Sequence, residues 1–147
     1  MAALGAPRPV TRLVLGLLAA VQATDGFYAL LAPRSFYEDF PIGRGWVEAL
    51  PAYNEHLLRD VGALFLATAV VLAAAAIWLE RRLVLVSLVS FLVFAVPHTI
   101  YHLFNLGGIS TGDAVAEAVL LVLTVIAPLA LLVAMLRPRP RPQPADG

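Results

Sequence analysis

Four long apolar stretches constrain the fold of this chain more than any other feature of its sequence. They run over residues 13–32, 60–79, 83–104 and 113–136. Each has about the 20 residues that an α-helix needs to cross a hydrocarbon core of ~30 Å. Because a helix satisfies its own backbone hydrogen bonds in lipid, we predict an all-α integral membrane protein. We expect a four-helix bundle that forms a single domain over residues 1–136.

The composition also favours a lipid environment. Hydrophobic residues make up 61% of the chain and charged residues 14%, against roughly 45–50% and 25% in a typical soluble protein. The formal net charge is zero, so no overall field attracts nucleic acid, and we expect the lipid bilayer to be the main partner. The sequence contains no cysteine, which excludes disulfides and thiolate metal sites.

The placement of arginine predicts the orientation of the four helices. Seven arginines would lie on one side of the membrane: Arg8, Arg12, Arg81, Arg82, Arg137, Arg139 and Arg141. Three would lie on the other side, among several acidic residues: Arg34, Arg44 and Arg59. By the positive-inside rule, both termini are then cytoplasmic. All ten basic residues are arginine, a bias typical of GC-rich bacterial genes, so we expect the plasma (inner) membrane of a bacterium.

The two ends of the chain carry further predictions. The tail over residues 137–147, RPRPRPQPADG, has the composition of a disordered segment, and we expect it in the cytoplasm. The first apolar stretch has an alternative interpretation as a cleaved signal peptide, because Val21-Gln22-Ala23 fits a small-residue cleavage motif. The apolar run continues beyond that motif, which favours a membrane span.

One long connection, over residues 33–59, joins the first two spans on the predicted outer side. Ser35 and Glu38 fit a capping box, which predicts a short amphipathic helix that Pro41 ends. Aromatic residues give this segment an apolar face: Phe36, Tyr37, Phe40, Trp46 and Tyr53. Such a face is typical of a helix at the membrane interface, although the segment could also cover a cavity below it.

Ionisable side chains gather near one end of the predicted spans. With a rise of about 1.5 Å per residue, the members of this outer layer are Asp25, His56, Asp60, His98, His102 and Glu117. The inner part of the spans carries hydroxyl groups, such as those of Thr68 and Ser87. Because a charge in hydrocarbon is costly, such residues are functional candidates. We therefore predict a ligand-binding site formed by the outer layer, with Tyr28 and Tyr101 as its walls.

The spacing of the histidines suggests a metal site as an alternative. His98 and His102 are four residues apart and share one face of the third span, directly after Pro97, where we expect a kink. His56 and Asp60 have the same spacing on the second span, and helix bundles build metal sites from such pairs. The four side chains would suit Zn²⁺, Fe²⁺, Mn²⁺ or Cu²⁺. The same groups could instead bind a polar head group, relay a proton, or form a structural or solvated network.

Two stretches carry a family resemblance. The first is the opening helix, Arg12-Leu-Val-Leu-Gly16 through Asp25-Gly26-Phe27-Tyr28 to Ala32-Pro33, and the second is the helix entry Arg59-Asp60-Val61-Gly62-Ala63-Leu64. Together with the hydropathy they resemble the DoxX-like group of small four-helix bacterial membrane proteins. The resemblance implies the fold and the location. Since the name-giving members are associated with quinone-linked redox complexes, it also suggests a quinone as a ligand or cofactor. It does not extend to the histidine pair.

Three functions are open from the sequence. The first is a binding or redox-accessory protein whose outer site holds a small apolar ligand with a polar head group, such as a quinone or a lipid-derived molecule. The second is a metalloprotein with a divalent transition metal on His56, Asp60, His98 and His102, and with Glu117 nearby as a base. The third is a structural or interaction subunit, paired with another membrane protein or with a second copy of itself. Soluble-enzyme motifs are absent from the sequence, and enzymatic activity is left open.

Overall fold

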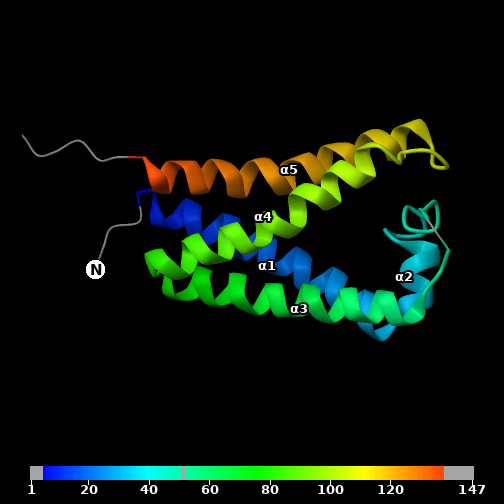
Figure 1. The fold of residues 1–147 in the computed structure, drawn as a ribbon, viewed down its shortest axis with the longest axis horizontal. Helices are drawn as coiled ribbons and strands as arrows, with labels where there is room; N and C mark the ends of the chain where they lie inside the picture. Colours follow the sequence, from blue (N-terminus) through cyan, green and yellow to red (C-terminus); the bar gives the residue numbers. More distant parts are fainter. Residues whose placement is uncertain (1–4, 51, 138–147) are drawn as a thin grey trace, which may run out of the picture.

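A computed structural model describes residues 5–50 and 52–137. In this part of the chain there are five helices and no strand. The helices are α1 (Arg8–Leu31), α2 (Pro33–Asp39), α3 (Glu55–Trp78), α4 (Arg81–Leu103) and α5 (Thr111–Leu136). The four long helices run side by side and alternate in direction (Figure 1). All four are long and apolar enough to cross a membrane, as the sequence predicted, which suggests a multi-pass membrane protein.

The long helices extend beyond the apolar stretches because capping groups, and not hydropathy, decide where a helix begins. α3 begins at Glu55, where the side chain of Asn54 accepts a hydrogen bond from Leu57 N–H. α5 begins after Ser110, whose hydroxyl accepts a hydrogen bond from Asp113 N–H and so caps the helix. The polar first turns of both helices therefore remain helical.

The connection between α1 and α3 contains a short helix, but its start differs from the predicted one. α2 begins at Pro33 with Ala32 at its N-cap, so Ser35 lies inside the helix and makes no capping box. The hydroxyl of Ser35 instead donates to Asp39 at 2.8 Å. Proline is favoured in the first turn of a helix because its missing N–H group has no partner there in any case. The chain therefore turns directly from α1 into α2.

The closest helix contact joins α1 to α3 and depends on two glycines. A Cβ atom added at Gly62 would lie 2.6 Å from Leu30 N and 2.9 Å from the carbonyl oxygen of Gly26. A Cβ atom at Gly26 would lie 2.9 Å from the carbonyl oxygen of Gly62. Small residues let the backbones of membrane helices approach closely. This contact makes α1 and α3 the most extensively packed pair of the described helices.

Among the described residues, the buried hydrophobic core fills one half of the molecule. We call this half the terminal end, because it holds the start of α1, the turn between α3 and α4, and the end of α5 (Figure 1). Its fully or nearly fully buried side chains include Leu15, Leu72, Ala75, Val84, Leu88, Phe91 and Met135. The opposite half, the loop end, holds α2, the loop residues 40–50 and 52–54, and the turn over residues 104–110.

Arginine side chains form hydrogen bonds between neighbouring helices. Arg12 Nε donates to the carbonyl of Ala76 at 3.1 Å, and Arg81 donates to that of Met135 at 3.0 Å. At the loop end, Arg59 donates to the carbonyl of Leu30. Each acceptor lies in the last turn of its helix, where a carbonyl has no partner within the helix. These arginines thus satisfy polar groups of the backbone and also connect α1 to α3 and α4 to α5.

The glycine contact predicts a strong effect of one methyl group. We expect Gly62→Ala to lower the free energy of unfolding by about 1–3 kcal/mol, because the new Cβ has no room and the helices must separate. Thermal or SDS-induced unfolding in detergent measures this change. Gly16→Ala is the matched control: a Cβ there meets no atom within 4 Å. This control should be neutral or stabilising by up to ~1 kcal/mol, and equal effects of the two substitutions would contradict the role of the contact.

Candidate functional site

A cavity of about 410 Å³ lies between the helices at the loop end. α1, α3 and α4 supply most of its walls, with contributions from α2, the following loop and α5. Its apolar lining residues include Leu18, Val21, Phe36, Phe40, Leu58, Val61, Phe65, Phe91 and Phe94. Its polar lining residues are Gln22, Asp25, His98, Tyr101, His102 and Thr124. The size and the mostly apolar lining are typical of small-molecule sites in proteins.

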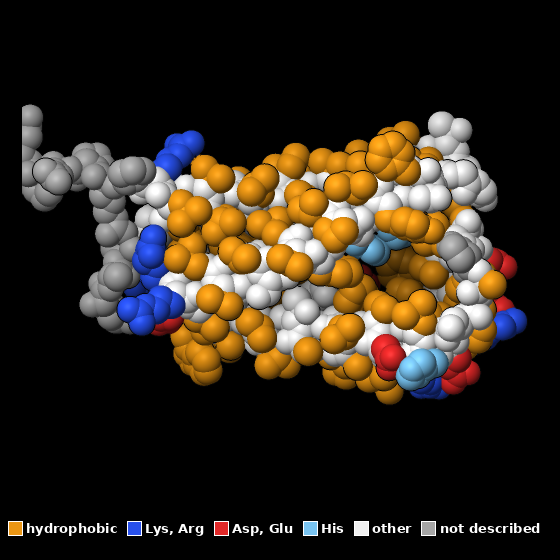
Figure 2. Space-filling model, in the orientation of Figure 1, with side chains coloured by type: hydrophobic (Ala, Val, Ile, Leu, Met, Phe, Trp, Pro, Cys, Tyr) orange, Lys and Arg blue, Asp and Glu red, His pale blue; other side chains and the backbone are white. Residues whose placement is uncertain are grey.

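The cavity opens through the side of the molecule. Figure 2 shows a hollow between the side chains of α3 and α4, with a histidine visible at its rim. The two helices are joined by a short turn at the terminal end and diverge toward the loop end (Figure 1). The divergence leaves the gap that the cavity occupies. If the four helices cross a bilayer, this opening faces lipid and not water.

The loop after α2 closes the loop end of the cavity, and Asp113 holds the loop in place. Trp46 Nε1 donates to Asp113 Oδ1 at 3.2 Å, and the guanidinium of Arg44 pairs with the same oxygen. Trp46 is buried, and its neighbour Val47 lines the cavity together with Leu50. The Asp113 carboxylate belongs to the first turn of α5. The loop is therefore attached to α5 across the end of the molecule, which closes that route into the cavity.

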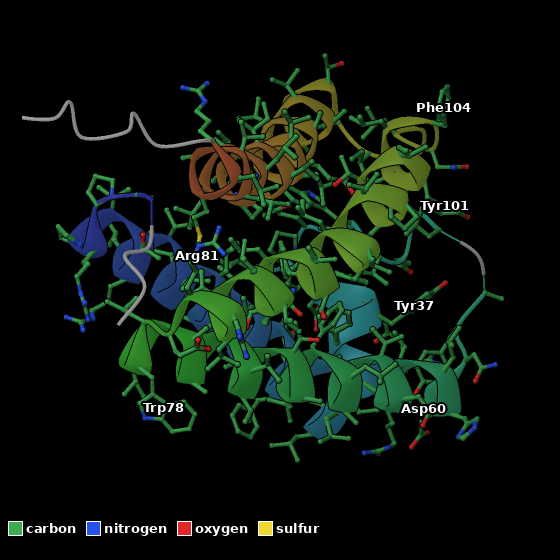
Figure 3. The ribbon with its side chains drawn as sticks, turned by 60° about the vertical axis from the view of Figure 1, so that its left-hand side comes forward. Tyr37, Asp60, Trp78, Arg81, Tyr101 and Phe104 are labelled. Atoms are coloured by element: carbon green, nitrogen blue, oxygen red, sulfur yellow. The ribbon has the colours of Figure 1, made fainter. Side chains whose placement is uncertain are left out.

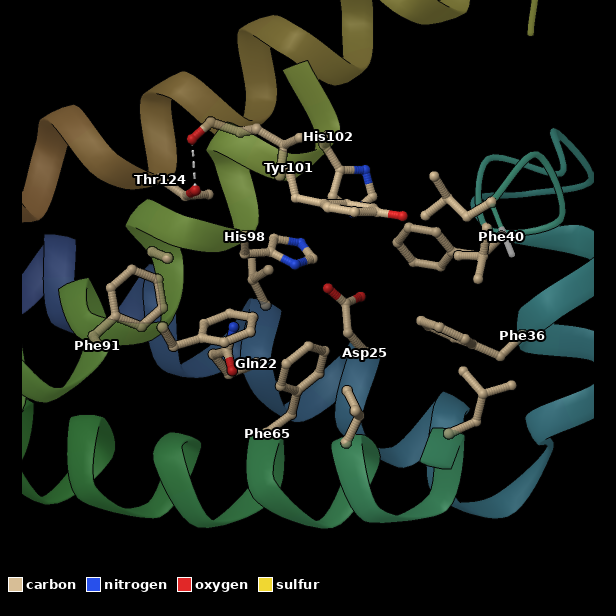
Figure 4. Close-up of a pocket in the computed structure, with 18 of the residues that line it drawn as sticks. Gln22, Asp25, Phe36, Phe40, Phe65, Phe91, His98, Tyr101, His102 and Thr124 are labelled. Carbon is tan, nitrogen blue, oxygen red and sulfur yellow. Dashed lines mark hydrogen bonds between the residues drawn. The ribbon is translucent and has the colours of Figure 1, made fainter. Parts of the chain in front are cut away.

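Two polar residues of α1 reach into the cavity from the same helix face. Gln22 and Asp25 are three residues apart, which places them one above the other. Gln22 is 6% exposed, and its Oε1 atom has no hydrogen-bond partner. Figure 4 shows Asp25 extending into the cavity toward the side from which His98 projects. Asp25 forms no salt bridge with Arg59, which pairs instead with Glu55 and the carbonyl of Leu30.

The two histidines of α4 lie next to each other on the opposite wall. The ring centroids of His98 and His102 are 4.4 Å apart, and the ring of His98 stacks on Phe94 with a centroid distance of 4.9 Å. His102 Nδ1 lies 2.5 Å from Glu117 Oε1 of α5, and Glu117 is 5% exposed. A carboxylate accepts from the ring, so it fixes the orientation of the imidazole. Glu117 itself contacts His102 but is not among the residues that line the cavity.

The structure places the two predicted wall tyrosines differently. Tyr101 lines the cavity beside the histidines (Figure 4). Tyr28 does not line it: its hydroxyl shares a hydrogen bond of 2.9 Å with the Ser35 hydroxyl, and its ring packs edge-on against Phe36 at 5.4 Å. Tyr28 therefore holds α2 against α1 and adjoins the cavity lining through Phe36 and Phe40.

The predicted four-residue metal set is not brought together. His56 and Asp60 pair with each other on the outside of α3, where their side chains are 88% and 58% exposed. In a helix of 3.6 residues per turn, they lie on the face opposite Leu58, Val61 and Phe65, which line the cavity. Figure 3 shows Asp60 at the outer surface of α3. Within residues 5–50 and 52–137, no group of three or more His, Cys, Asp and Glu side chains could hold a metal ion.

Sequence reasoning missed two features of the site. Gln22 received no role in it, although a polar amide one turn before Asp25 in an apolar span is a signal that the two share a face. The attachment of Arg44 and Trp46 to Asp113 has no local signal, because these residues are far apart in the chain. The position of a residue along a helix can be calculated from the sequence. The residue that it contacts in a distant segment cannot.

The arrangement supports two kinds of chemistry. An apolar cavity with a few polar groups on facing walls can bind a molecule that has a polar head and an apolar body. The pair of His102 and Glu117 shares one hydrogen bond, and imidazole and carboxylate are both groups that serve as proton donors and acceptors in catalysis. The groups nearest to the cavity therefore suit ligand binding directly, and proton transfer to a bound ligand is chemically compatible with them.

Comparison of the chain with protein-family models, with curated proteins and with solved structures finds no match. The cavity and its polar residues therefore carry the functional argument by themselves. The resemblance to the DoxX-like group stays a prediction.

Loss of the Glu117 carboxylate should destabilise the protein through His102. We expect Glu117→Leu to lower the free energy of unfolding by about 1–3 kcal/mol, because it leaves a buried ring N–H without a partner. Glu117→Gln keeps an acceptor and should cost less. Unfolding in detergent measures both, and nitrogen NMR of labelled histidine should show that the His102 tautomer changes in the leucine variant alone. Glu48→Leu, at an exposed position, is the control, and an equal loss there would contradict the pairing.

Release of the loop should be visible at Trp46. In a Trp78→Phe background, which leaves Trp46 as the one tryptophan, we expect Asp113→Ala to shift the emission of Trp46 to longer wavelength and to increase its quenching by iodide. The reason is that the substitution removes the acceptor of both Trp46 and Arg44. Asp39→Ala, which leaves that attachment intact, is the control. Unchanged emission in Asp113→Ala would show that the loop is held by other contacts.

Proposed function

We propose that this chain is a multi-pass protein of a bacterial plasma membrane that binds a small amphiphilic molecule, such as a quinone-like or lipid-like compound, in the cavity at the loop end. The apolar body of the ligand contacts the aromatic and aliphatic lining. Its polar head lies among Gln22, Asp25, His98, Tyr101 and His102. In this function the protein acts as a binding or redox-accessory protein.

One observation carries the proposal: a mostly apolar cavity of about 410 Å³ that contains a buried and unpartnered amide oxygen, that of Gln22. Buried polar atoms in proteins nearly always have a hydrogen-bond partner, and an atom without one needs an explanation. Because Gln22 lines the cavity, a ligand that occupies it would supply that partner once the amide turns toward it. The same ligand would cover the apolar surfaces of Phe36, Phe65 and Phe94, which line the cavity.

The location of the site along the helices supports an amphiphile over a water-soluble ligand. Asp25 lies six residues before the end of α1, and His98 lies five before the end of α4, so both lie about 8–9 Å below the loop end at 1.5 Å per residue. A head group at this depth remains near the interface. The side opening between α3 and α4 then leaves the tail of the ligand in the hydrocarbon (Figure 2).

The orientation in the membrane is part of the proposal. Arg8, Arg12, Arg81 and Arg82 belong to the terminal end, where basic side chains gather in Figure 2. The positive-inside rule favours this end in the cytoplasm. The cavity and its loop then face the outer side, and both termini are cytoplasmic.

Of the alternatives, neither is favoured by a specific observation. A metal site would need more ligands than the histidine pair on α4 supplies, and His56 and Asp60 lie on the other side of α3. A purely structural network would satisfy its own hydrogen bonds, whereas Gln22 Oε1 has no partner. A redox role and a protein partner stay predictions.

The proposal predicts that filling the cavity abolishes binding. Val61 lines the cavity from α3, whereas Leu64, three residues further along the same helix, is 65% exposed. We expect Val61→Trp to reduce binding of para-nonylphenol by at least about tenfold, because the indole occupies the space of the ring. Leu64→Trp adds the same side chain outside the cavity and should bind as the wild type does. Equilibrium binding of labelled para-nonylphenol to the protein in lipid nanodiscs measures both.

Empty nanodiscs correct this experiment for partition of the probe into lipid. Wild-type binding that does not exceed the level of empty nanodiscs would contradict the proposed function. Equal loss in Val61→Trp and Leu64→Trp would place the binding outside the cavity.

A further inference from the structure

We infer that the cavity selects a neutral amphiphile whose head group donates hydrogen bonds, such as a phenol or hydroquinone hydroxyl, and that it rejects anionic lipids. This inference rests on the proposed function and adds the chemical class of the ligand. It follows from the hydrogen-bonding character of three residues on two facing helices: Gln22 and Asp25 on α1, and His102 on α4.

The first acceptor is the amide oxygen of Gln22. It is shielded from solvent and has no partner, and a buried acceptor without a partner destabilises a structure by about 1–3 kcal/mol. An oxygen accepts hydrogen bonds and cannot donate them. A ligand that carries a hydroxyl therefore gains the bond that Gln22 lacks. A ligand that carries only carbonyl or ether oxygens at this place leaves the amide oxygen unsatisfied.

The second acceptor is the carboxylate of Asp25, one turn further along the same face of α1. Asp25 lines the cavity, and no hydrogen bond or salt bridge to another described residue is formed by its side chain. An ionised carboxylate offers two acceptor oxygens and no donor. The two neighbouring residues therefore present acceptors side by side to the same region of the cavity.

The third acceptor is a ring nitrogen of His102. Its Nδ1 atom lies 2.5 Å from Glu117 Oε1, and toward a carboxylate this nitrogen is the donor. In the neutral ring, Nε2 is then left as an acceptor. Glu117 thus acts as a positioning residue: it fixes the tautomer of His102 without lining the cavity itself.

The charge of the lining excludes anionic head groups. The described residues that line the cavity include Asp25 but neither Arg nor Lys. A fatty acid or a phosphate head group would find no arginine or lysine in this lining as a counter-ion, and beside an ionised Asp25 its charge would be repelled strongly in a poorly solvated site. The three arginines of the loop end bind elsewhere: Arg34 pairs with Glu38, Arg44 with Asp113, and Arg59 with Glu55 and the carbonyl of Leu30.

A series of probes with one tail and different heads tests this inference. Para-nonylphenol donates and accepts hydrogen bonds, para-nonylanisole only accepts them, and para-nonylbenzoate is anionic. Each is titrated against the protein in nanodiscs, with Val61→Trp as the background. We expect the phenol to bind at least about tenfold more tightly than the anisole, a ratio equivalent to about 1.4 kcal/mol. The benzoate should not exceed the background.

Two variants assign the selectivity to residues. Gln22→Leu removes the orphan acceptor with little change in volume, so it should weaken phenol binding about tenfold and leave anisole binding unchanged. Asp25→Asn adds N–H donors at the second position and should strengthen anisole binding about fivefold. A gain of affinity cannot result from misfolding, which keeps the test informative if Gln22→Leu unfolds the protein. Thr24→Val, on an exposed part of α1, is the matched control for both.

The outcomes separate this inference from the proposed function. If no probe binds above the Val61→Trp background, both are overturned. If the anisole or the benzoate binds as tightly as the phenol, the cavity binds amphiphiles but the selection for a donating head is wrong. Nonylamine that binds more tightly than the phenol, and loses this advantage in Asp25→Asn, would identify a cationic ligand and would also overturn the hydroxyl assignment.

Discussion

The contact between Gly26 and Gly62 determines how the remaining helices are arranged. Without side chains at these positions, the backbones of α1 and α3 approach until the next atoms meet, so that even a Cβ at Gly62 would lie 2.6 Å from a backbone nitrogen. In lipid, where no hydrophobic force draws helices together, such close packing is a main source of association. α1 and α3 therefore form a tight pair, and α4 with α5 packs against it mainly at the terminal end.

The cavity is a geometric consequence of this arrangement. α4 leaves the short turn after α3 beside the tight pair and then diverges from it, and Leu88, Phe91 and Ala95 fill the space as far as the middle of the molecule. Beyond that point the helices are too far apart for side chains to fill the space between them. The loop after α2 covers the end of the space because Asp113 holds Arg44 and Trp46. The cavity therefore stays open at the side of the molecule, between α3 and α4.

The polar residues in and beside the cavity differ in whether they have a hydrogen-bond partner within the protein. Glu117 and His102 satisfy each other and would be stable without a ligand. Gln22 and Asp25 have no comparable partner within the described chain, and they face the same space. Natural proteins keep such unsatisfied groups mainly where function requires them. The difference between the satisfied pair on one wall and the open acceptors on the other is what favours the proposed ligand-binding role over a purely structural one.

The sequence by itself determined the number of long helices, their approximate limits and the gathering of ionisable residues at one end, because hydropathy and position along a helix are local properties. Asp25, His98, Tyr101 and His102, which the sequence assigned to one site, all line one cavity in the structure. The sequence prediction was wrong to add His56 and Asp60, since spacing gives a shared face but not the direction in which that face points. Only the tertiary structure decided this, because the rotation of α3 about its axis is fixed by the contact of Gly62 with α1. The pairing of Glu117 with His102 and of Asp113 with the loop likewise depends on contacts between distant segments, which no local pattern records.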